Sequence, residues 1–152
     1  VNELVLVASL GISMHRGLGM EPWMFRAVAR GMRVPGLRAL LLPRVREQYR
    51  RRRFPGFEQM TPDQFAVQLR ALGATDFAAM RRAVGSPLPA TLHAFACDDH
   101  MVETHVSDEL ARALPGAEVL RFPEGGHNIQ KTRAVEIGAA VVSLLGRATT
   151  RS

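Results

Sequence analysis

The sequence lacks several features that mark particular classes of protein. Cys97 is its only cysteine, so an intrachain disulfide is excluded, as is usual in a reducing compartment. No apolar run approaches the roughly 18 residues that cross a bilayer. The N-terminus also lacks the basic, apolar and small-residue succession of a secretory signal. We therefore expect a cytoplasmic protein without a membrane span.

Lysine is almost absent, although the chain is basic. Lys131 is the only lysine among 20 basic residues, and the formal net charge is +6. Such a charge raises nucleic acid as a partner. However, codon composition can produce an excess of arginine without selection for binding, so we expect no nucleic-acid partner.

The sequence does have the composition and pattern of a folded α/β domain. It has 152 residues, of which 47% are hydrophobic and 22% charged, close to average globular usage. Short apolar runs predict strands at residues 4–8, 91–96 and 117–122, and helical spacing predicts helices at 106–114 and about 132–145. This alternation predicts parallel strands with helices on the faces of the sheet.

The middle of the chain, from about residue 21 to 84, has a helical pattern. Prolines interrupt it and predict several short helices, with breaks at Pro35, Pro43, Pro55 and Pro62. The best bounded of these helices begins at Thr61, which can cap its N-terminus, and runs to Gly73. The stretch 37–42 is predicted to be helical as well.

Two loops leave strands at the edge of the sheet where ligands bind in open parallel sheets. One loop begins with Asp98 and Asp99, and the other is a glycine turn that ends on His127. The 28 positions from Asp99 to His127 accommodate one helix and one strand, which return the chain to the same edge. A carboxylate bound to one ring nitrogen fixes the tautomer of a histidine and leaves the other nitrogen as a general base.

Over most of its length the chain resembles the C-terminal half of an α/β-hydrolase. The resemblance lies in the run Asp-Asp-His-Met-Val at 98–102, the run Pro-Gly-Ala-Glu-Val-Leu-Arg-Phe-Pro-Glu-Gly-Gly-His at 115–127, and the helices that follow each. It implies an α/β fold with a helical cap insertion. It also implies that the three strands are the sixth, seventh and eighth of the usual eight.

The resemblance divides the chain into core and cap. Residues 1–14 and 87–147 would form the C-terminal part of the hydrolase core, and residues 15–86 would form the cap or lid. We expect residues 148–152 to be a disordered tail. Because a buried parallel strand begins almost at Val1, we expect a fragment whose partner is the upstream half of the same fold.

The resemblance implies that Asp99 is the acid and His127 the histidine of a catalytic triad. The family's usual glycine, three positions before the acid, is Ala96 here, so the pattern is imperfect at that position. Asp98 is the weaker candidate for the acid, and we expect it to lie nearer the strand end and to turn aside. An Asp-Asp pair on its own is typical of a solvated turn.

The nucleophile of this fold lies on a Gly-x-Ser-x-Gly elbow between a strand and a helix. No such pentapeptide occurs, and the nearest is Gly-Ile-Ser-Met-His at 11–15. Its histidine stands where close helix packing requires a small residue. Ser13 stays open as a nucleophile, but we place it in the loop after the first strand, where the family begins its cap.

The resemblance implies that the full-length protein is a serine hydrolase without a cofactor. It would cleave a carboxylic ester, or a related acyl or carbon–carbon bond, in a small apolar substrate. We expect the chain alone to be inactive because its nucleophile is upstream. The alternative is a non-catalytic pseudo-hydrolase or interaction module, which the missing serine favours.

Three groups of residues remain in addition to the proposed triad residues. The other histidines predict no metal site, because they form no cluster at ligand spacing: His15, His93 (within a strand), His100 (beside the acid loop) and His105. The arginine-rich run 44–53 can bind an anionic group or form a solvated helix face. Four residues either cover the active site from the cap or simply pack: Met14, Trp23, Met24 and Phe25.

Overall fold

The structure is a computed structural model that describes residues 3–13, 20–54 and 56–149. The chain divides into two compact units, of which one comprises Val1–Gly17 with Phe77–Ser152 and the other comprises Leu18–Asp76. Helix α4 (Phe77–Val84), which we placed within the cap, belongs to the first unit. None of the described helices combines the length and the apolar character needed to cross a bilayer.

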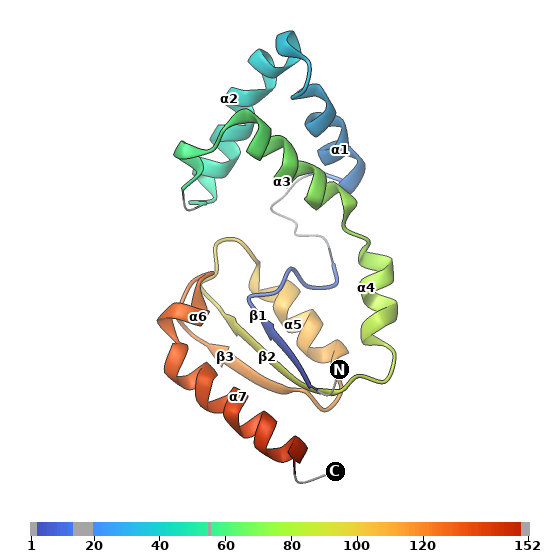
Figure 1. The fold of residues 1–152 in the computed structure, drawn as a ribbon, viewed down its shortest axis with the longest axis vertical. Coiled ribbons are helices and arrows are strands. Elements are labelled where there is room, and N and C mark those ends of the chain that lie inside the picture. The colour runs from blue at the N-terminus through green and yellow to red at the C-terminus, as the bar shows by residue number, and fades with distance from the viewer. Residues whose placement is uncertain (1–2, 14–19, 55, 150–152) are drawn as a thin grey trace. The chain divides into compact units, whose positions relative to one another are not determined.

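The first unit is built on a three-stranded sheet in the order β1-β2-β3 (Figure 1). Its strands are β1 (Glu3–Val7), β2 (Ala90–Ala96) and β3 (Glu118–Phe122). Both pairs of neighbours are parallel, as the alternation of strands and helices predicts. The carboxyl ends of the three strands therefore lie at one edge of the sheet.

Helices cover the sheet on both faces, and β2 is its buried centre. Helix α7 (Ala134–Thr149) packs through Ala140 and Leu144 against Leu92 of β2. On the opposite face, Leu110 of helix α5 (Thr104–Ala113) packs in a cluster with Ile12. The predicted arrangement of helices on the faces is confirmed.

The end of the chain differs from its predicted bounds. In place of one helix over 132–145, α6 (Ile129–Thr132) and α7 are separated at Arg133. The backbone leaves helical geometry there, and the Arg133 side chain turns back to the carbonyl of Glu124. Helix α7 continues to Thr149, into the segment that we predicted as a disordered tail, and residues 150–152 lie outside the described residues.

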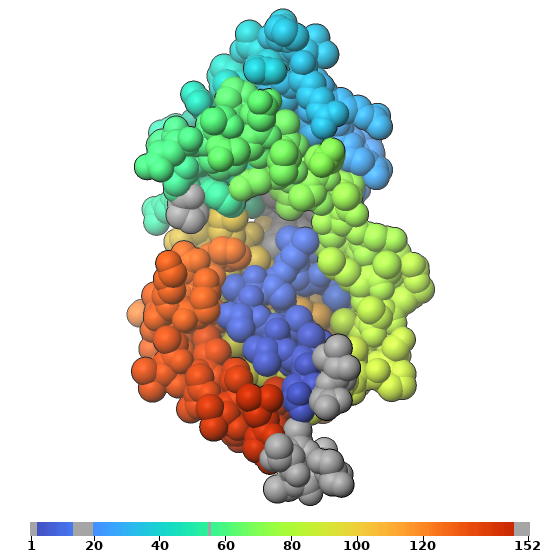
Figure 2. Space-filling model, in the orientation of Figure 1, coloured from blue at the N-terminus to red at the C-terminus, as the bar shows by residue number. Residues whose placement is uncertain are grey.

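Strand β1 lies at one edge of the described sheet and pairs only with β2 there. Its central residue Val5 is 40% exposed. Figure 2 shows the surface of β1 and its following loop, in blue, open between α7, in orange and red, and α4, in yellow-green. A strand edge of this kind offers unpaired backbone groups to a further strand.

The second unit is a small helical cluster. Its elements are α1 (Pro22–Gly31), α2 (Pro35–Arg51), the 3₁₀ turn η2 (Phe57–Gln59) and α3 (Pro62–Ala74). Phe65 of α3 is fully buried and makes an edge-to-face contact with Tyr49 of α2, with ring centroids 4.9 Å apart. Thr61 caps α3 as predicted: its hydroxyl accepts from the N–H of Gln64, whose side chain binds the Thr61 N–H in return.

The prediction that Pro43 breaks the helical pattern is wrong. Helix α2 runs through Pro43 without interruption. Proline removes one backbone N–H from a helix interior, but the buried Val45 and Tyr49 in the following turns anchor α2 to its unit. Packing therefore outweighs the loss of one hydrogen bond, whereas Pro35 and Pro62 stand in the first turns of their helices.

The arginine-rich run lies mostly on α2 and faces solvent. Glu47 accepts from Arg50 and Arg51 at 2.8 Å, and both arginine side chains are largely exposed. Hydrogen bonds from Arg50 and then Arg51 lower the pKa of Glu47 to about 2. These contacts are typical of a solvated helix face, which contributes little to stability.

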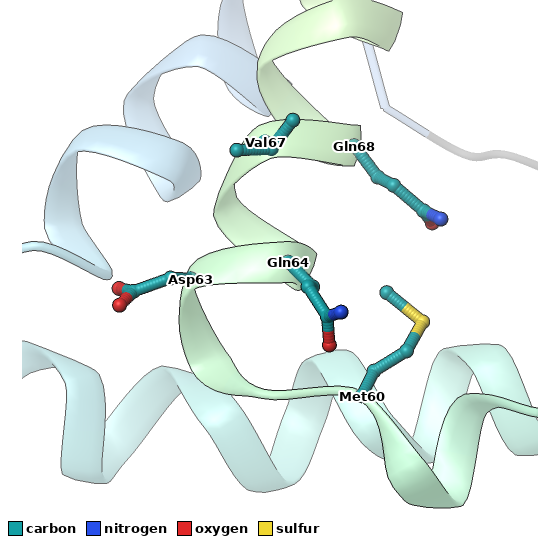
Figure 3. A pocket seen from close by; sticks show the side chains of 5 residues that line it. All are labelled: Met60, Asp63, Gln64, Val67 and Gln68. Carbon is teal, nitrogen blue, oxygen red and sulfur yellow. The ribbon is translucent and has the colours of Figure 1, made fainter.

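Two further features of the second unit bear on the cap prediction. Phe25 is buried within the unit, whereas Trp23 is 61% exposed, and Met14 lies outside the described residues. A pocket of about 390 Å³ lies along α3 (Figure 3). Its lining comprises Met60, Asp63, Gln64, Val67 and Gln68. Asp63 is the one ionisable side chain among these five residues.

His93 lies within β2, as predicted, and is fully buried. Its ring stacks on Phe95, and neither ring nitrogen has a hydrogen-bond partner within the described residues. Burial lowers the pKa of His93 to about 4, although the charge of Asp108 acts in the opposite direction. The folded chain therefore holds His93 neutral at pH values where an exposed histidine binds a proton.

We expect the stability of the chain to fall as the pH decreases from about 6.5 to 4, because the unfolded state binds a proton that the folded state excludes. Replacing His93 by leucine is expected to reduce this pH-dependent decrease in the free energy of unfolding by up to about 3 kcal/mol. Denaturant unfolding at pH 6.5 and 4.5 measures the decrease. His105→Leu, which replaces an exposed histidine, is the control. An equal loss in the wild-type and His93→Leu chains would contradict the expectation.

Candidate active site

The acid loop follows β2 directly and holds Asp99 in a fixed orientation. Asp99 Oδ1 accepts from the N–H groups of Met101, at 2.7 Å, and Val102, at 3.1 Å. The Thr104 hydroxyl, at the start of α5, donates to the carbonyl of Cys97 and closes the loop. The Asp99 side chain is 3% exposed, so its carboxylate is a buried group with little freedom.

The histidine turn follows β3 and depends on two glycines. Gly125 and Gly126 have φ values of +156° and +66°, which side chains rarely adopt. A Cβ on Gly125 would also lie 2.9 Å from Ile129 Cγ2, so α6 approaches the turn closely. The turn thus brings His127 back over the end of the sheet.

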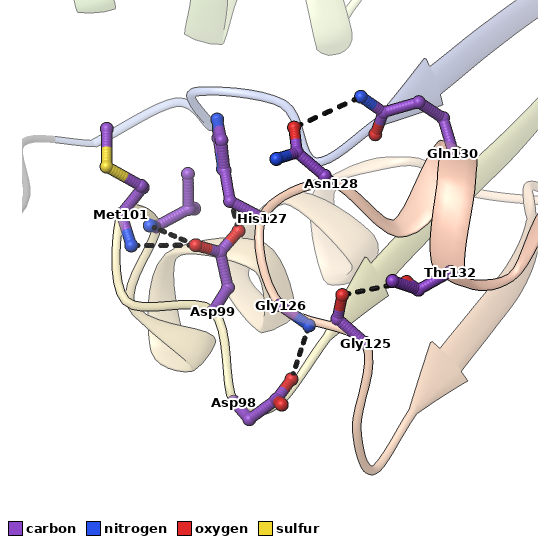
Figure 4. A network of polar contacts seen from close by, with 10 residues as sticks. Asp98, Asp99, Met101, Gly125, Gly126, His127, Asn128, Gln130 and Thr132 are labelled. Atoms are coloured by element: carbon purple, nitrogen blue, oxygen red, sulfur yellow. Dashed lines mark hydrogen bonds and ion pairs between the residues drawn. The ribbon is translucent and has the colours of Figure 1, made fainter. Parts of the chain in front are cut away.

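The two loops bring Asp99 and His127 together (Figure 4). Asp99 Oδ2 and His127 Nδ1 are 3.0 Å apart. The His127 side chain is 36% exposed, in contrast to its buried partner. Within the described residues, Nε2 of His127 has no hydrogen-bond partner and is the nitrogen available to a ligand.

Electrostatics favours the charged forms of both partners. The hydrogen bond with Asp99 raises the pKa of His127, and this outweighs the opposing effect of burial. For Asp99, burial is the largest influence and opposes ionisation, but the hydrogen bonds from His127, Met101 and Val102 together lower the pKa. The pair is therefore an ionised carboxylate beside an imidazole that is a stronger base than an exposed histidine.

Asp98 turns away from the imidazole, as we expected, but it is not a free group in solvent. Its Oδ1 accepts from the backbone N–H of Gly126 at 2.8 Å (Figure 4). This hydrogen bond is the main cause of a lowered pKa for Asp98. The two neighbouring carboxylates thus bind neighbouring residues of the histidine turn.

Sequence reasoning missed two further residues that hold the histidine turn. The Thr132 hydroxyl donates to the carbonyl of Gly125 at 2.8 Å, and Arg133 Nε donates to the carbonyl of Glu124 at 3.0 Å. Both side chains come from the short α6 and the residue that ends it. A polar pair at the end of a helix carries no distinctive signal in a sequence.

The remaining sequence candidates are not joined to this pair. Ser13 lies in a bend after β1, the next described helix begins at Pro22, and within the described residues no hydrogen bond joins Ser13 to Asp99 or His127. His100 is exposed beside the acid loop, and His15 lies outside the described residues. No group of three metal-binding side chains gathers in the part of the chain that the structure describes, and the absence of a metal stays a prediction.

The parallel sheet covered by helices, with a helical insertion after its first strand, is part of an α/β-hydrolase fold. Solved structures that share this fold include the three described below. Neither a protein-family model nor a curated protein sequence matches the chain.

Each of the three structures is similar in fold but distant in sequence. MenH from S. aureus has 16% identity and a TM-score of 0.61, with 98% of this chain and 60% of MenH covered. The enol-lactonase from Burkholderia xenovorans LB400 has 20% identity and a TM-score of 0.60, with 96% and 56% covered. The esterase EaEST from Exiguobacterium antarcticum has 17% identity and a TM-score of 0.56, with 94% and 56% covered. The chain therefore spans less than two thirds of the length of these enzymes.

Proposed function

We propose that the chain is the acid–base part of a serine hydrolase with the α/β-hydrolase fold. Asp99 is the acid and His127 the general base of a nucleophile–His–Asp triad. The observation that carries this proposal is the 3.0 Å contact between Asp99 Oδ2 and His127 Nδ1, with a buried carboxylate and a half-exposed imidazole. The nucleophile comes from the upstream half of the fold, because no Gly-x-Ser-x-Gly elbow occurs among the 152 residues.

In this mechanism, Asp99 holds the proton of His127 on Nδ1 and leaves Nε2 as the base. Nε2 takes the proton of the serine hydroxyl as the serine oxygen attacks the carbonyl carbon. The imidazolium that forms is stabilised by the Asp99 carboxylate. Nε2 then gives this proton to the leaving alcohol, and a water molecule releases the acid from the acyl-enzyme by the same two proton transfers.

We propose a carboxylic ester, or a related acyl or carbon–carbon bond, as the group that is cleaved. Two of the solved structures are an esterase and an enol-lactonase, and both names refer to ester bonds. A small apolar substrate, the absence of a cofactor and a cytoplasmic location remain predictions. The role of the second unit as a cap over the substrate is also a proposal, supported by its place in the sequence after β1.

The test is to compare the chain with a longer protein in which these 152 residues follow the upstream half, here called the full-fold protein. We expect the chain alone to hydrolyse no p-nitrophenyl ester and to bind no fluorophosphonate, because it lacks the group that forms the covalent intermediate. Esterase assays and mass spectrometry measure both. Stoichiometric labelling of the chain at Ser13 would contradict the proposal and make Ser13 the nucleophile.

The alternative is a non-catalytic protein that uses this fold as a binding surface. The arginines of α2 are the feature that fits it, since several are exposed. The two functions differ in the sequence immediately before Val1, where an in-frame Gly-x-Ser-x-Gly supports the enzyme. An upstream half without a nucleophile supports the binding protein.

A further inference from the structure

Two contacts join the acid loop to the histidine turn, and they connect consecutive residues. Asp98 binds Gly126 and Asp99 binds His127, so each contact spans 28 positions of the sequence. The first contact joins a side chain to the backbone, and the second joins two side chains. Asp98 and Gly126, the residues directly before the two members of the proposed catalytic pair, therefore form a second contact with each other.

The histidine turn needs external support because it is made of glycine. Gly125 and Gly126 restrict their own backbone less than any other residue would, and a turn of two glycines is mobile unless other groups hold it. On one side, Thr132 and Arg133 bind the carbonyls of Gly125 and Glu124. On the other side, Asp98 binds the N–H of Gly126, the residue directly before His127.

The hydrogen bond from the Gly126 N–H to Asp98 is stronger than one between two neutral groups. Its acceptor is a carboxylate, its length is 2.8 Å, and hydrogen bonds to ionised groups are roughly twice as strong as those between neutral groups. The same N–H lowers the pKa of Asp98, as expected for a donor that stabilises the ionised carboxylate.

We infer that Asp98 is a positioning residue: its carboxylate holds the N–H of Gly126 and thereby keeps His127 Nδ1 within hydrogen-bonding distance of Asp99. This inference rests on the proposed role of His127 as the general base. Asp98 touches neither the imidazole nor a substrate in this account. It acts only through the backbone of the turn.

Two substitutions of Asp98 separate the effect of its hydrogen bond to the turn from the effect of its negative charge on His127. Asp98→Ala removes both the acceptor and the negative charge, whereas Asp98→Asn removes the charge but keeps an acceptor oxygen for the Gly126 N–H. Glu124→Ala is the matched control, because it removes a negative charge from the same turn, and its carboxylate makes no hydrogen bond among those described. Asp99→Asn is the reference variant, in which the His127 pKa should no longer be raised.

The measurement is an NMR titration of the His127 ring in the chain and these four variants, with a thermal melt of each to confirm folding. We expect the His127 pKa in Asp98→Ala to fall most of the way to its value in Asp99→Asn. In Asp98→Asn and Glu124→Ala the His127 pKa should stay close to that of the wild type. Equal losses in Asp98→Ala and Asp98→Asn would assign the effect to charge and overturn the inference. An unchanged pKa in Asp98→Ala would overturn it as well.

Turnover supplies an independent readout in the full-fold protein. A displacement of about 1 Å in a catalytic group can cost roughly 10²-fold in rate. We therefore expect Asp98→Ala to lower kcat by about 10- to 100-fold with little change in KM, and Asp98→Asn to restore most of it. A full-fold protein without activity would contradict the proposed function, whereas the NMR result would still decide whether Asp98 positions His127.

Discussion

Replacing Asp99 by asparagine in the full-fold protein is expected to lower turnover by roughly 10³- to 10⁴-fold. An amide cannot hold the Nδ1 proton as the carboxylate does, and it can instead donate to Nδ1, which places the imidazole proton on Nε2. The nitrogen that must act as a base is then already protonated. The magnitude is taken from the same substitution in serine proteases, in which the geometry of the triad is preserved but the histidine has the wrong tautomer.

The matched variant is Asp98→Asn, for which we expect a loss of less than about tenfold. Asp98 lies beside Asp99 and has the same charge, but its carboxylate faces the backbone of Gly126 rather than the ring. Steady-state kinetics on a soluble ester, with folding checked by thermal melts, compares the two variants. If the losses were reversed, Asp98 would be the acid and the assignment of Asp99 would be wrong.

The pH dependence of activity gives a further comparison between the wild type and Asp99→Asn, because the structure predicts the direction in which the profile shifts. Because the hydrogen bond to Asp99 raises the pKa of His127, the wild-type base becomes protonated at a higher pH than an exposed histidine would. Activity should therefore decrease on the acid side through a pKa above the ordinary value for histidine. In Asp99→Asn this limb should move to lower pH, because the charge that raises the pKa is gone.

Replacing His127 by alanine is expected to have the largest effect, a fall in turnover of roughly 10⁴- to 10⁶-fold in the full-fold protein. Alanine removes the only group in the described site that can take a proton from a serine and return it to the leaving group. The remaining activity would come from substrate binding and transition-state stabilisation by other parts of the fold. His105→Ala, in which an exposed histidine of α5 is lost, is the control and should keep nearly full activity.

The sheet and the proximity of Asp99 to His127 could be predicted from the sequence, because both follow from the order and spacing of the strands and helices. Short apolar runs that alternate with helical spacing led to β1, β2 and β3, and parallel pairing followed from the connections between them. The spacing between Asp99 and His127 then required the two side chains to return to one edge. The cap of α3 at Thr61 was equally local, because a capping box lies within four residues.

Other features depend on contacts between distant parts of the chain and had no local signal. The continuity of α2 through Pro43 depends on buried residues beyond the proline, and α4 joins the first unit rather than the second. The contact of Asp98 with Gly126 was missed for the same reason. An Asp-Asp pair is typical of a solvated turn, and only the fold reveals that the first carboxylate reaches a backbone N–H on the neighbouring strand's loop.

The most direct test of the central claim is the rate at which a fluorophosphonate labels the full-fold protein, in the wild type and in His127→Ala. We expect one serine before Val1 to be labelled stoichiometrically in the wild type, and the labelling to be slower by orders of magnitude without His127, because the hydroxyl then has no base. Mass spectrometry of the adduct identifies the serine. A labelling rate that does not depend on His127 would contradict the claim that this chain supplies the base of a catalytic triad.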